Sequence, residues 1–548
     1  MRSPNLKFYL PPALAGVVLV CASSVIYSWS STFVNLACSI QDDSFYYFIP
    51  AWNGGHGAGF TFGGEKTSGF QPLYELVLLL ASNFCRSLES LVRLAITING
   101  CLFALTALLV GLAIRPLLGS ASARDRPIAG ALSMCVGAFS FLSLHTVYFS
   151  SVTGKENALA ALLLVAIIWG VFAGSRGIGR SGALGMLCGL LLLTRIAPAS
   201  ILYVGIAIVF LDGWKGRLAG LVGCLIPLAA WTTFAHSYFG HVIPMSMLVK
   251  MAAPNHLSLA QSIKSGLRYF WESGKFSLST GSRFNLLQLQ AREGVRPVFQ
   301  VAVMAAASAA ALVAALRGLF TGAASRAALA LLAFDVGGVF SNMVFGTAQA
   351  GRSDDMYYSV WYIYDLPVLV AINCGFAVAW AQSAFATLRI RAGATAILAI
   401  ACAAYFMGDV AWYVRLKPYD AADDAKFAAS WQNKTIEAAH WFRGHVTPGR
   451  SDYKVVAYSA GALSFFLHDH VVNLDGLANN AAGEALISTQ SAAEYVRALK
   501  PDYFLDICGI EKQFGNLERL YRVSFPKQGD YCIDRFVYAP GPRGHVQP

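Results

Sequence analysis

Two adjacent carboxylic acids, Asp42 and Asp43, are the residues of this sequence whose types and spacing best suit chemistry. They come directly after a hydrophobic segment and lie in the polar stretch 41–75. Adjacent acids at a membrane boundary are costly unless they are solvated, paired or functional. A carboxylate can take a proton from an attacking hydroxyl group, and the aromatic rings of this stretch can pack against the C–H faces of sugars. The pattern predicts a site for sugar chemistry, with capping of the following helix as the alternative.

The composition predicts a polytopic membrane protein. Of the 548 residues, 56% are hydrophobic and 13% are charged, whereas about a quarter of the residues of a soluble protein are charged. Apolar runs of about 20 residues recur along the chain as far as Trp412. They predict eleven spans, of which the fifth and sixth could be one pair broken at Pro198: 9–30, 90–114, 127–149, 156–173, 182–195, 197–212, 217–236, 297–317, 326–346, 357–382 and 391–412. The apolar piece 72–84 is too short to cross and is expected to be interfacial or re-entrant.

The basic residues predict the orientation of these spans. Lysine and arginine gather in alternate short loops, so the positive-inside rule places the N-terminus in the cytoplasm. Segments 31–89, 237–296 and 413–548 are then expected on the periplasmic face of a bacterial inner membrane. The net charge of +11 reflects this topology rather than nucleic-acid binding.

Residues 413–548 change character and predict a soluble domain. Strands are expected at 454–459, 471–474 and 503–507, and helices at 461–467 and 491–499. The predicted fold is therefore an all-α membrane domain over 1–412 followed by a small α/β domain. Outside the cytoplasm, Cys508 and Cys532 could form a disulfide.

The location of the acids restricts the kind of sugar donor. Glycosyl transfer needs an activated donor, and no pool of nucleotide sugars exists outside the cytoplasm. A sugar attached to a polyprenyl phosphate meets this need, because its lipid tail can lie between helices and its phosphate is a good leaving group. Basic residues would stabilise the departing phosphate.

Several motifs, in one order along the chain, carry a family resemblance. They are DDSFYY from Asp42, GHGAGFTF from Gly55, TSGFQPLY from Thr67, TGKEN from Thr153, YFGHVIPMSMLVK ending at Lys250, WYIY from Trp361, and GALSFF from Gly461 with VNLDGL from Val472. This set resembles bacterial GT-C membrane glycosyltransferases that use polyprenyl-phosphate sugars, and it is similar to the group that contains mycobacterial terminal arabinofuranosyltransferases. Ser68 stands where that group has asparagine, which leaves the identity of the sugar open.

The resemblance implies roles for residues of segment 31–89, called the first outer segment below. Asp42 would be the general base, and Asp43 would position it or the acceptor. His56 would contact the donor phosphate or the acceptor, with a hydrogen-bonded turn histidine as the alternative. Gln71, in the turn after Gly69, is a further candidate for substrate binding.

The other implied site residues lie at the outer ends of spans. Glu156 would line the cavity or cap the fourth span, and capping is the favoured reading. Lys250, Arg195 and Arg352 would bind the lipid phosphate, unless they only reach the headgroups. Trp361 and Tyr362 would form a wall of the donor cavity or belong to an interfacial aromatic belt.

The expected function is transfer of one sugar, with inversion, from a polyprenyl-phosphate donor to a hydroxyl of a glycan, a lipid-linked glycan or a protein. The sequence identifies no certain cofactor; Asp42, Asp43 and the donor phosphate could hold a divalent cation. A flippase for lipid-linked sugars is one alternative, and a flippase would place charged residues within the spans. Here the spans are nearly free of charged residues, and Asp335 is the main exception. A non-enzymatic assembly protein of the cell envelope is the other.

Overall fold

The computed structural model describes most of the predicted elements. Spans 297–317 and 391–412 lie outside the described residues, and so do Arg352, Trp361 and Tyr362. The boundary predicted between residues 412 and 413 also falls there and stays a prediction. Apart from a few isolated positions, the described residues are 4–118, 127–143, 153–174, 177–252, 326–349, 364–384, 431–446, 453–467, 470–489, 491–515, 517–523 and 530–537.

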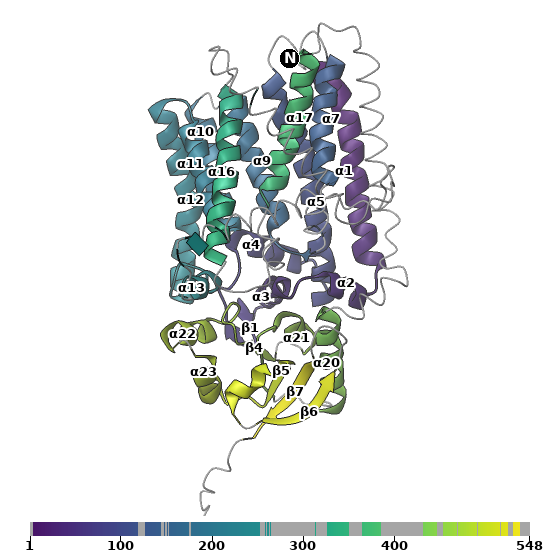
Figure 1. The fold of residues 1–548 in the computed structure, drawn as a ribbon, viewed down its shortest axis with the longest axis vertical. Coiled ribbons are helices and arrows are strands. Elements are labelled where there is room, and N and C mark those ends of the chain that lie inside the picture. Colours follow the sequence, from purple (N-terminus) through teal and green to yellow (C-terminus); the bar gives the residue numbers. More distant parts are fainter. Residues whose placement is uncertain are drawn as a thin grey trace, which may run out of the picture.

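Each predicted span that falls on described residues is a helix, and these helices stand side by side in a bundle (Figure 1). They are α1 (Pro4–Ser30), α5 (Leu88–Ile114), α7 (Pro127–Ser143), α9 (Asn157–Ala173), α10 (Ile178–Thr194), α11 (Pro198–Val209), α12 (Gly213–Phe239), α16 (Arg326–Gln349) and α17 (Leu366–Ala384). Among the described residues, three helices are long and apolar enough to cross a membrane: Leu6–Ser30, Leu88–Leu118 and Gly213–Phe239. The fifth and sixth spans are two separate helices. Pro198 occupies the first turn of α11, where its missing amide hydrogen costs nothing.

Glycines bring α10 and α12 into close contact. A Cβ atom added at Gly185 would lie 1.9 Å from the carbonyl oxygen of Gly220, and one at Gly223 would lie 2.1 Å from that of Gly182. No side chain fits between these backbones. Small residues drive helix association in this way inside membranes, where lipid tails are as apolar as leucine.

The first outer segment folds into short elements beneath the bundle (Figure 1). These are α2 (Phe33–Ser39), the 3-10 helix η1 (Asp42–Ser44), α3 (Phe45–Gly55), the strands β1 (Thr61–Phe62) and β2 (Glu65–Lys66), and α4 (Pro72–Ser82). Helix α4 has 11 residues, so it spans about 16 Å, well short of the hydrocarbon thickness of about 30 Å. Its length agrees with the prediction that 72–84 does not cross.

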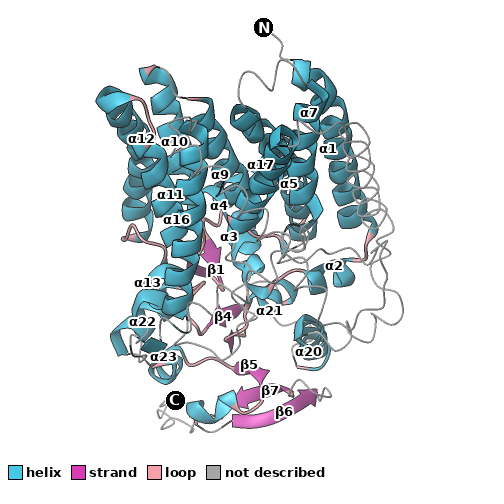
Figure 2. Cartoon of the chain, turned by 45° about the horizontal axis from the view of Figure 1, so that its top comes forward, coloured by secondary structure: helices cyan, strands magenta, loops and turns pink. Residues whose placement is uncertain are grey.

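The C-terminal region forms a five-stranded mixed sheet, and the strands gather at the end of the molecule below α3 and α13 (Met245–Ala252) (Figure 2). The strand order is β4-β3-β5-β7-β6, with β3 parallel to β4 and β5, and with β7 antiparallel to β5 and β6. The strands are β3 (Val455–Ala457), β4 (Val471–Asn473), β5 (Tyr503–Ile507), β6 (Leu517–Val523) and β7 (Tyr531–Phe536). The helices are α20 (Trp431–His445), α21 (Gly461–Phe466), α22 (Asn480–Thr489) and α23 (Ala492–Leu499). The three predicted strands and two predicted helices are confirmed, whereas β6, β7, α20 and α22 were not predicted.

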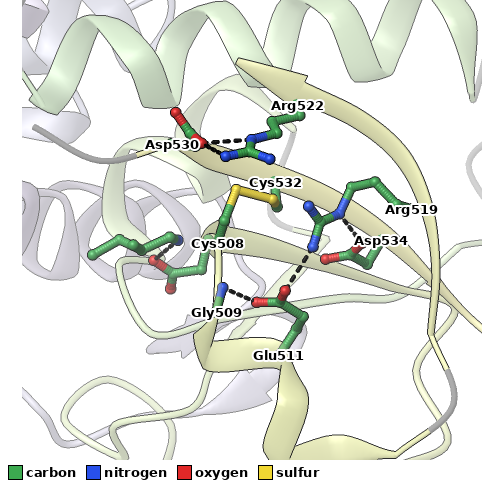
Figure 3. The surroundings of a disulfide bond; sticks show 10 residues. Cys508, Gly509, Glu511, Arg519, Arg522, Asp530, Cys532 and Asp534 are labelled. Atoms are coloured by element: carbon green, nitrogen blue, oxygen red, sulfur yellow. Dashed lines mark hydrogen bonds and ion pairs between the residues drawn. A yellow bond between two sulfur atoms is a disulfide. The ribbon is translucent and has the colours of Figure 1, made fainter. Parts of the chain in front are cut away.

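A disulfide joins Cys508 to Cys532 and ties the end of β5 to β7 (Figure 3). The Cα atoms of the two cysteines are 5.0 Å apart, a normal separation for a disulfide. Ion pairs of Arg519 with Glu511 and Asp534, and of Arg522 with Asp530, surround this bond.

One hydrophobic core extends from the first outer segment into the C-terminal domain. It joins Phe45 and Tyr74 of the outer segment to Phe442, Leu463 and Ile533 of the domain. Phe33 stacks on Phe465, with ring centroids 4.9 Å apart. The domain therefore packs against the outer segment as a continuous structure.

Candidate active site

The acid pair lies directly before helix α3. Asp42 and Asp43 form the first turn of η1, which runs directly into α3. Ser44 is buried, and its hydroxyl donates to the carbonyl oxygen of Thr153. This bond fixes the acid pair against the TGKEN motif, more than 100 residues away in the sequence.

Asp43 faces an ammonium group from that motif. Its carboxylate accepts from Nζ of Lys155 at 3.0 Å; the Lys155 side chain is 5% exposed, and the Asp43 side chain is 41% exposed. Partial burial raises the pKa of Asp43, but the positive charges of Lys155 and Lys250 outweigh it and hold the pKa below its usual value. At neutral pH the pair consists of an ionised, accessible carboxylate and a buried cation.

The position of Lys155 depends on its own turn. The Tyr74 hydroxyl donates to the carbonyl oxygen of Gly154 at 3.0 Å, and Nδ2 of Asn99 donates to that of Lys155 at 2.9 Å. Gly154 has φ +75°, and a Cβ atom there would lie 2.5 Å from the ring of Phe48. Helices α3, α4 and α5 therefore hold this turn from three sides.

Asp42 faces the C-terminal domain instead. Its carboxylate accepts from the backbone amides of Gly461 at 3.0 Å and Ala462 at 2.8 Å, which are the first amides of α21. The Tyr46 hydroxyl donates to the same carboxylate at 3.3 Å. Burial raises the pKa of Asp42 to about 6 although the two amide bonds oppose it, and the charges of Asp43 and Asp506 add to the rise.

Glu156 does not cap the fourth span, so that prediction is wrong. The residue stands at the N-cap of α9, but its side chain makes no capping hydrogen bond. It forms a buried ion pair with Arg195, and its other oxygen accepts from the Tyr47 hydroxyl at 2.9 Å. A nearby cation at the end of α10 outcompetes the backbone amides for this carboxylate, which sequence position alone did not reveal.

Arg195 is the partner of Glu156 in this ion pair. Its guanidinium donates to Glu156 and, at 3.0 Å, to Oδ1 of Asn157, and its side chain is 4% exposed. Arg195 therefore lies in the interior beside the turn that carries Lys155. Its charge is neutralised there rather than presented at an outer surface.

Lys250 lies near the acid pair. It is a partly exposed residue in the last turn of α13, and its charge acts on both Asp43 and Asp475. Helix α13 packs against α22 of the C-terminal domain. The structure thus brings α13, which belongs to the expected outside segment 237–296, to the site through that domain.

His56 and Gln71 have local roles. His56 follows the last residue of α3. Its Nδ1 lies 2.8 Å from the carbonyl oxygen of Trp52, and its ring stacks on the Trp52 ring with centroids 3.7 Å apart. Oε1 of Gln71 accepts from the amide of Ile196 at 3.2 Å, which links the start of α4 to the α10–α11 connection. The structure places neither side chain in contact with the acid pair.

Three residues of the site were missed as site residues, although each lies in a quoted motif: Lys155 in TGKEN, Asp475 in VNLDGL and Tyr46 in DDSFYY. Asp475 follows β4, and the charges of Asp42, Asp43 and Lys250 all act on it. Each of Lys155 and Asp475 is a charged residue inside a motif that carries the family resemblance, and this was the signal that could have identified them.

Within the described part of the chain, one group of side chains has metal-ligand spacing: Glu511, Cys532 and Asp534. Cys532 is in the disulfide, and Arg519 pairs with both carboxylates. These residues do not fit a metal ion, because their ligand atoms are already engaged.

Solved structures share this architecture. ArnT from Cupriavidus metallidurans bound to undecaprenyl phosphate matches 96% of this chain and 99% of its own, with a TM-score of 0.54 and 12% sequence identity. The apo state of ArnT from the same organism matches 95% of this chain and 98% of its own, with a TM-score of 0.55 and 14% identity. The chain has an ArnT-like GT-C fold. With the long apolar helices, this fold indicates an integral membrane protein.

Sequence comparison adds one match. A family described as Domain of unknown function (DUF8728) matches residues 424–539, which covers the mixed sheet and its helices. No curated protein matches the chain at a significant level.

Proposed function

We propose that this protein is a membrane glycosyltransferase of the bacterial inner membrane. It moves a sugar from a polyprenyl-phosphate donor to a hydroxyl of a glycan, a lipid-linked glycan or a protein on the periplasmic face. The observation that carries the proposal is the accessible Asp43 carboxylate held against buried Lys155, with Lys250 nearby. The fold supports it, since a structure with the same architecture was solved with undecaprenyl phosphate bound.

The geometry favours Asp43, rather than Asp42, as the general base. Both oxygens of Asp42 accept hydrogen bonds from α21, whereas the Asp43 side chain is 41% exposed. A base must reach the proton that it removes, so accessibility takes precedence over a pKa nearer to neutrality. Asp42 then acts as a positioning residue that fixes η1 on the C-terminal domain.

The reaction follows from these positions. The acceptor hydroxyl oxygen attacks the anomeric carbon, and its proton moves to the carboxylate of Asp43. The bond between the anomeric carbon and the phosphate oxygen breaks, and the polyprenyl phosphate leaves with the electron pair. Attack in line with the leaving group inverts the anomeric centre.

Lysines near the acid pair suit the departing phosphate. Lys250 is partly exposed, and Lys155 places a positive charge next to Asp43. Fixed positive charge in a partly desolvated site stabilises a leaving phosphate strongly. Arg195 is engaged by Glu156, so it orients the site rather than binding phosphate. Arg352 remains a candidate from the sequence.

The sequence leaves the transferred sugar open between a pentose, such as arabinofuranose, and a hexose. The first test therefore supplies purified protein in lipid nanodiscs with polyprenyl-phosphate arabinofuranose and, separately, with polyprenyl-phosphate hexoses. Release or transfer of sugar from any of these donors supports the function. If the wild-type protein consumes none of them, or moves an intact donor across proteoliposomes without cleaving it, the glycosyltransferase proposal is wrong and a flippase is favoured.

The assignment of the base has its own test. Asp43→Asn should lower transfer at least about 100-fold in protein that still unfolds cooperatively, with some loss of stability because buried Lys155 loses its counter-charge. Glu494→Gln, an exposed acid on α23, is the matched control and should be fully active. Near-normal activity of Asp43→Asn together with loss of activity in Asp42→Asn would return the base to Asp42.

A further inference from the structure

The loop after β4 brings the C-terminal domain directly to the acid pair. It carries Asp475, and its neighbour Leu477 lies against the first outer segment: a Cβ atom added at Gly69 would fall 1.8 Å from the carbonyl oxygen of Leu477. On its other side, Gly483 at the start of α22 touches Met245 of α13. This loop therefore lies between the segment that carries Asp43 and the helix that carries Lys250.

The side chain of Asn473 holds the loop in place. Oδ1 of Asn473 accepts from the amides of Leu477 at 3.1 Å and Ala478 at 3.2 Å, and its Nδ2 donates to the Tyr46 hydroxyl at 2.9 Å. Tyr46 in turn donates to Asp42. A continuous chain of hydrogen bonds thus connects the loop to the acid pair, and the bond between Asn473 and Tyr46 crosses from the C-terminal domain to the first outer segment.

We propose that this loop is the acceptor subsite and that Asp475 binds a hydroxyl group of the sugar acceptor beside the one that attacks. This inference rests on the proposed function and names a specificity-determining residue that neither the motif roles nor the fold assigns. Asp475 is partly exposed, and one of its oxygens accepts from the amide of Leu477 at 2.9 Å. Its neighbours in the site are the acids Asp42 and Asp43 and the cation Lys250.

Charge and location distinguish acceptor from donor. The two lysines are better partners for the donor phosphate than a neutral carboxyl group, because they carry positive charge. The donor approaches from the lipid, whereas Asp475 belongs to the domain at the far end from the bundle (Figure 1). A hydroxyl-bearing acceptor from the aqueous side can approach this loop without entering the lipid.

The protonation of Asp475 fits the role. Burial raises its pKa to about 8, the charges of Asp43 and Asp42 add to the rise, and the Leu477 amide and Lys250 oppose it. The group is therefore a neutral acid at pH 7, able to donate a hydrogen bond to an acceptor oxygen. An asparagine amide at this position can also donate a hydrogen bond and can still accept from Leu477, whereas alanine can do neither.

The experiment separates the acceptor from the donor. Purified wild type, Asp475→Asn and Asp475→Ala are given the best polyprenyl-phosphate sugar donor and the octyl glycoside that wild type glycosylates most rapidly. Asp475→Ala should raise the KM for the octyl glycoside at least about tenfold, as expected when a site built to bind a hydroxyl loses its partner. The KM for the donor and the binding of undecaprenyl phosphate should change less than twofold, and Asp475→Asn should restore most of the acceptor affinity.

Matched variants control for charge and for folding. Glu484→Gln removes an exposed carboxylate from α22 of the same domain and should leave both KM values unchanged. An unchanged acceptor KM in Asp475→Ala, or an equal loss of undecaprenyl phosphate binding, would overturn the acceptor subsite while leaving the proposed function intact. If wild-type protein cleaves no donor, the function and the subsite are both wrong.

Discussion

Asp42 and Asp43 are neighbours in the chain with opposite surroundings. Asp42 accepts two amide hydrogen bonds from the C-terminal domain, and Asp43 pairs with a lysine that follows the third predicted span. A backbone that turns through η1 directs successive side chains to different partners. The chemical difference between two identical residues therefore arises from what the fold places around each one.

Glu156 and Arg195 form the most deeply buried ion pair among the described residues, with side chains 6% and 4% exposed. Glu156→Gln should destabilise the protein by about 3–5 kcal/mol, because it leaves a buried guanidinium without its counter-charge. The double variant Glu156→Gln/Arg195→Gln should lose less than the sum of the two single variants. Thermal unfolding in detergent measures both effects, and additive losses would show that the two charges do not depend on each other.

At the scale of elements, the site is a meeting of short connections rather than of long helices. Helix η1 contributes Asp42 and Asp43, the TGKEN turn before α9 contributes Lys155, and the loop after β4 contributes Asp475. The apolar helices hold these connections at one end of the bundle (Figure 1). Such an arrangement is common, since loops on a rigid scaffold carry function more often than the scaffold does.

Gly154 tests how strictly the TGKEN turn must be shaped. Gly154→Ala should destabilise the protein by about 1–3 kcal/mol and reduce transfer, because Ala at φ +75° is strained and its Cβ meets the ring of Phe48. Gly174→Ala is the matched control: its φ is +76°, but no atom lies within 4 Å of the added Cβ. Equal activity in the two variants would contradict the view that this turn positions Lys155.

At the scale of the whole molecule, the C-terminal domain packs against the candidate site and contributes residues to it. It shares a hydrophobic core with the outer segment, caps Asp42 and supplies Asp475. A family of domains of unknown function matches this region. Its role in the present chain is, in our proposal, to complete a membrane-boundary active site from the aqueous side.

The disulfide should stabilise that domain. Cys508 and Cys532 are separated by 24 residues, and closing a loop of this size is worth about 3 kcal/mol. Replacing both with serine should lower the thermal unfolding temperature and weaken transfer at elevated temperature. Cys85→Ser, which removes a free cysteine of the bundle end, is the control. Identical unfolding of the wild type with and without reductant would contradict this prediction.

The sequence was sufficient for the features that depend on local pattern. Apolar runs predicted the bundle helices, and short apolar segments predicted strands β3, β4 and β5, because burial leaves an apolar signal in the sequence. Strands β6 and β7 were missed: their charged residues, such as Arg519 and Asp534, pair with one another and obscure the apolar pattern. The importance of the acid pair as a candidate site also came from local composition.

Only the tertiary structure decided which residues meet. Asp42 contacts α21 across 419 residues, and Lys155 reaches Asp43 across 112. No local pattern encodes such distances, because a side chain's partner depends on how distant elements pack. The same cause made Glu156 an ion-pair partner rather than a cap, and it brought Asp475 of the C-terminal domain to the end of the helical bundle that carries the acid pair.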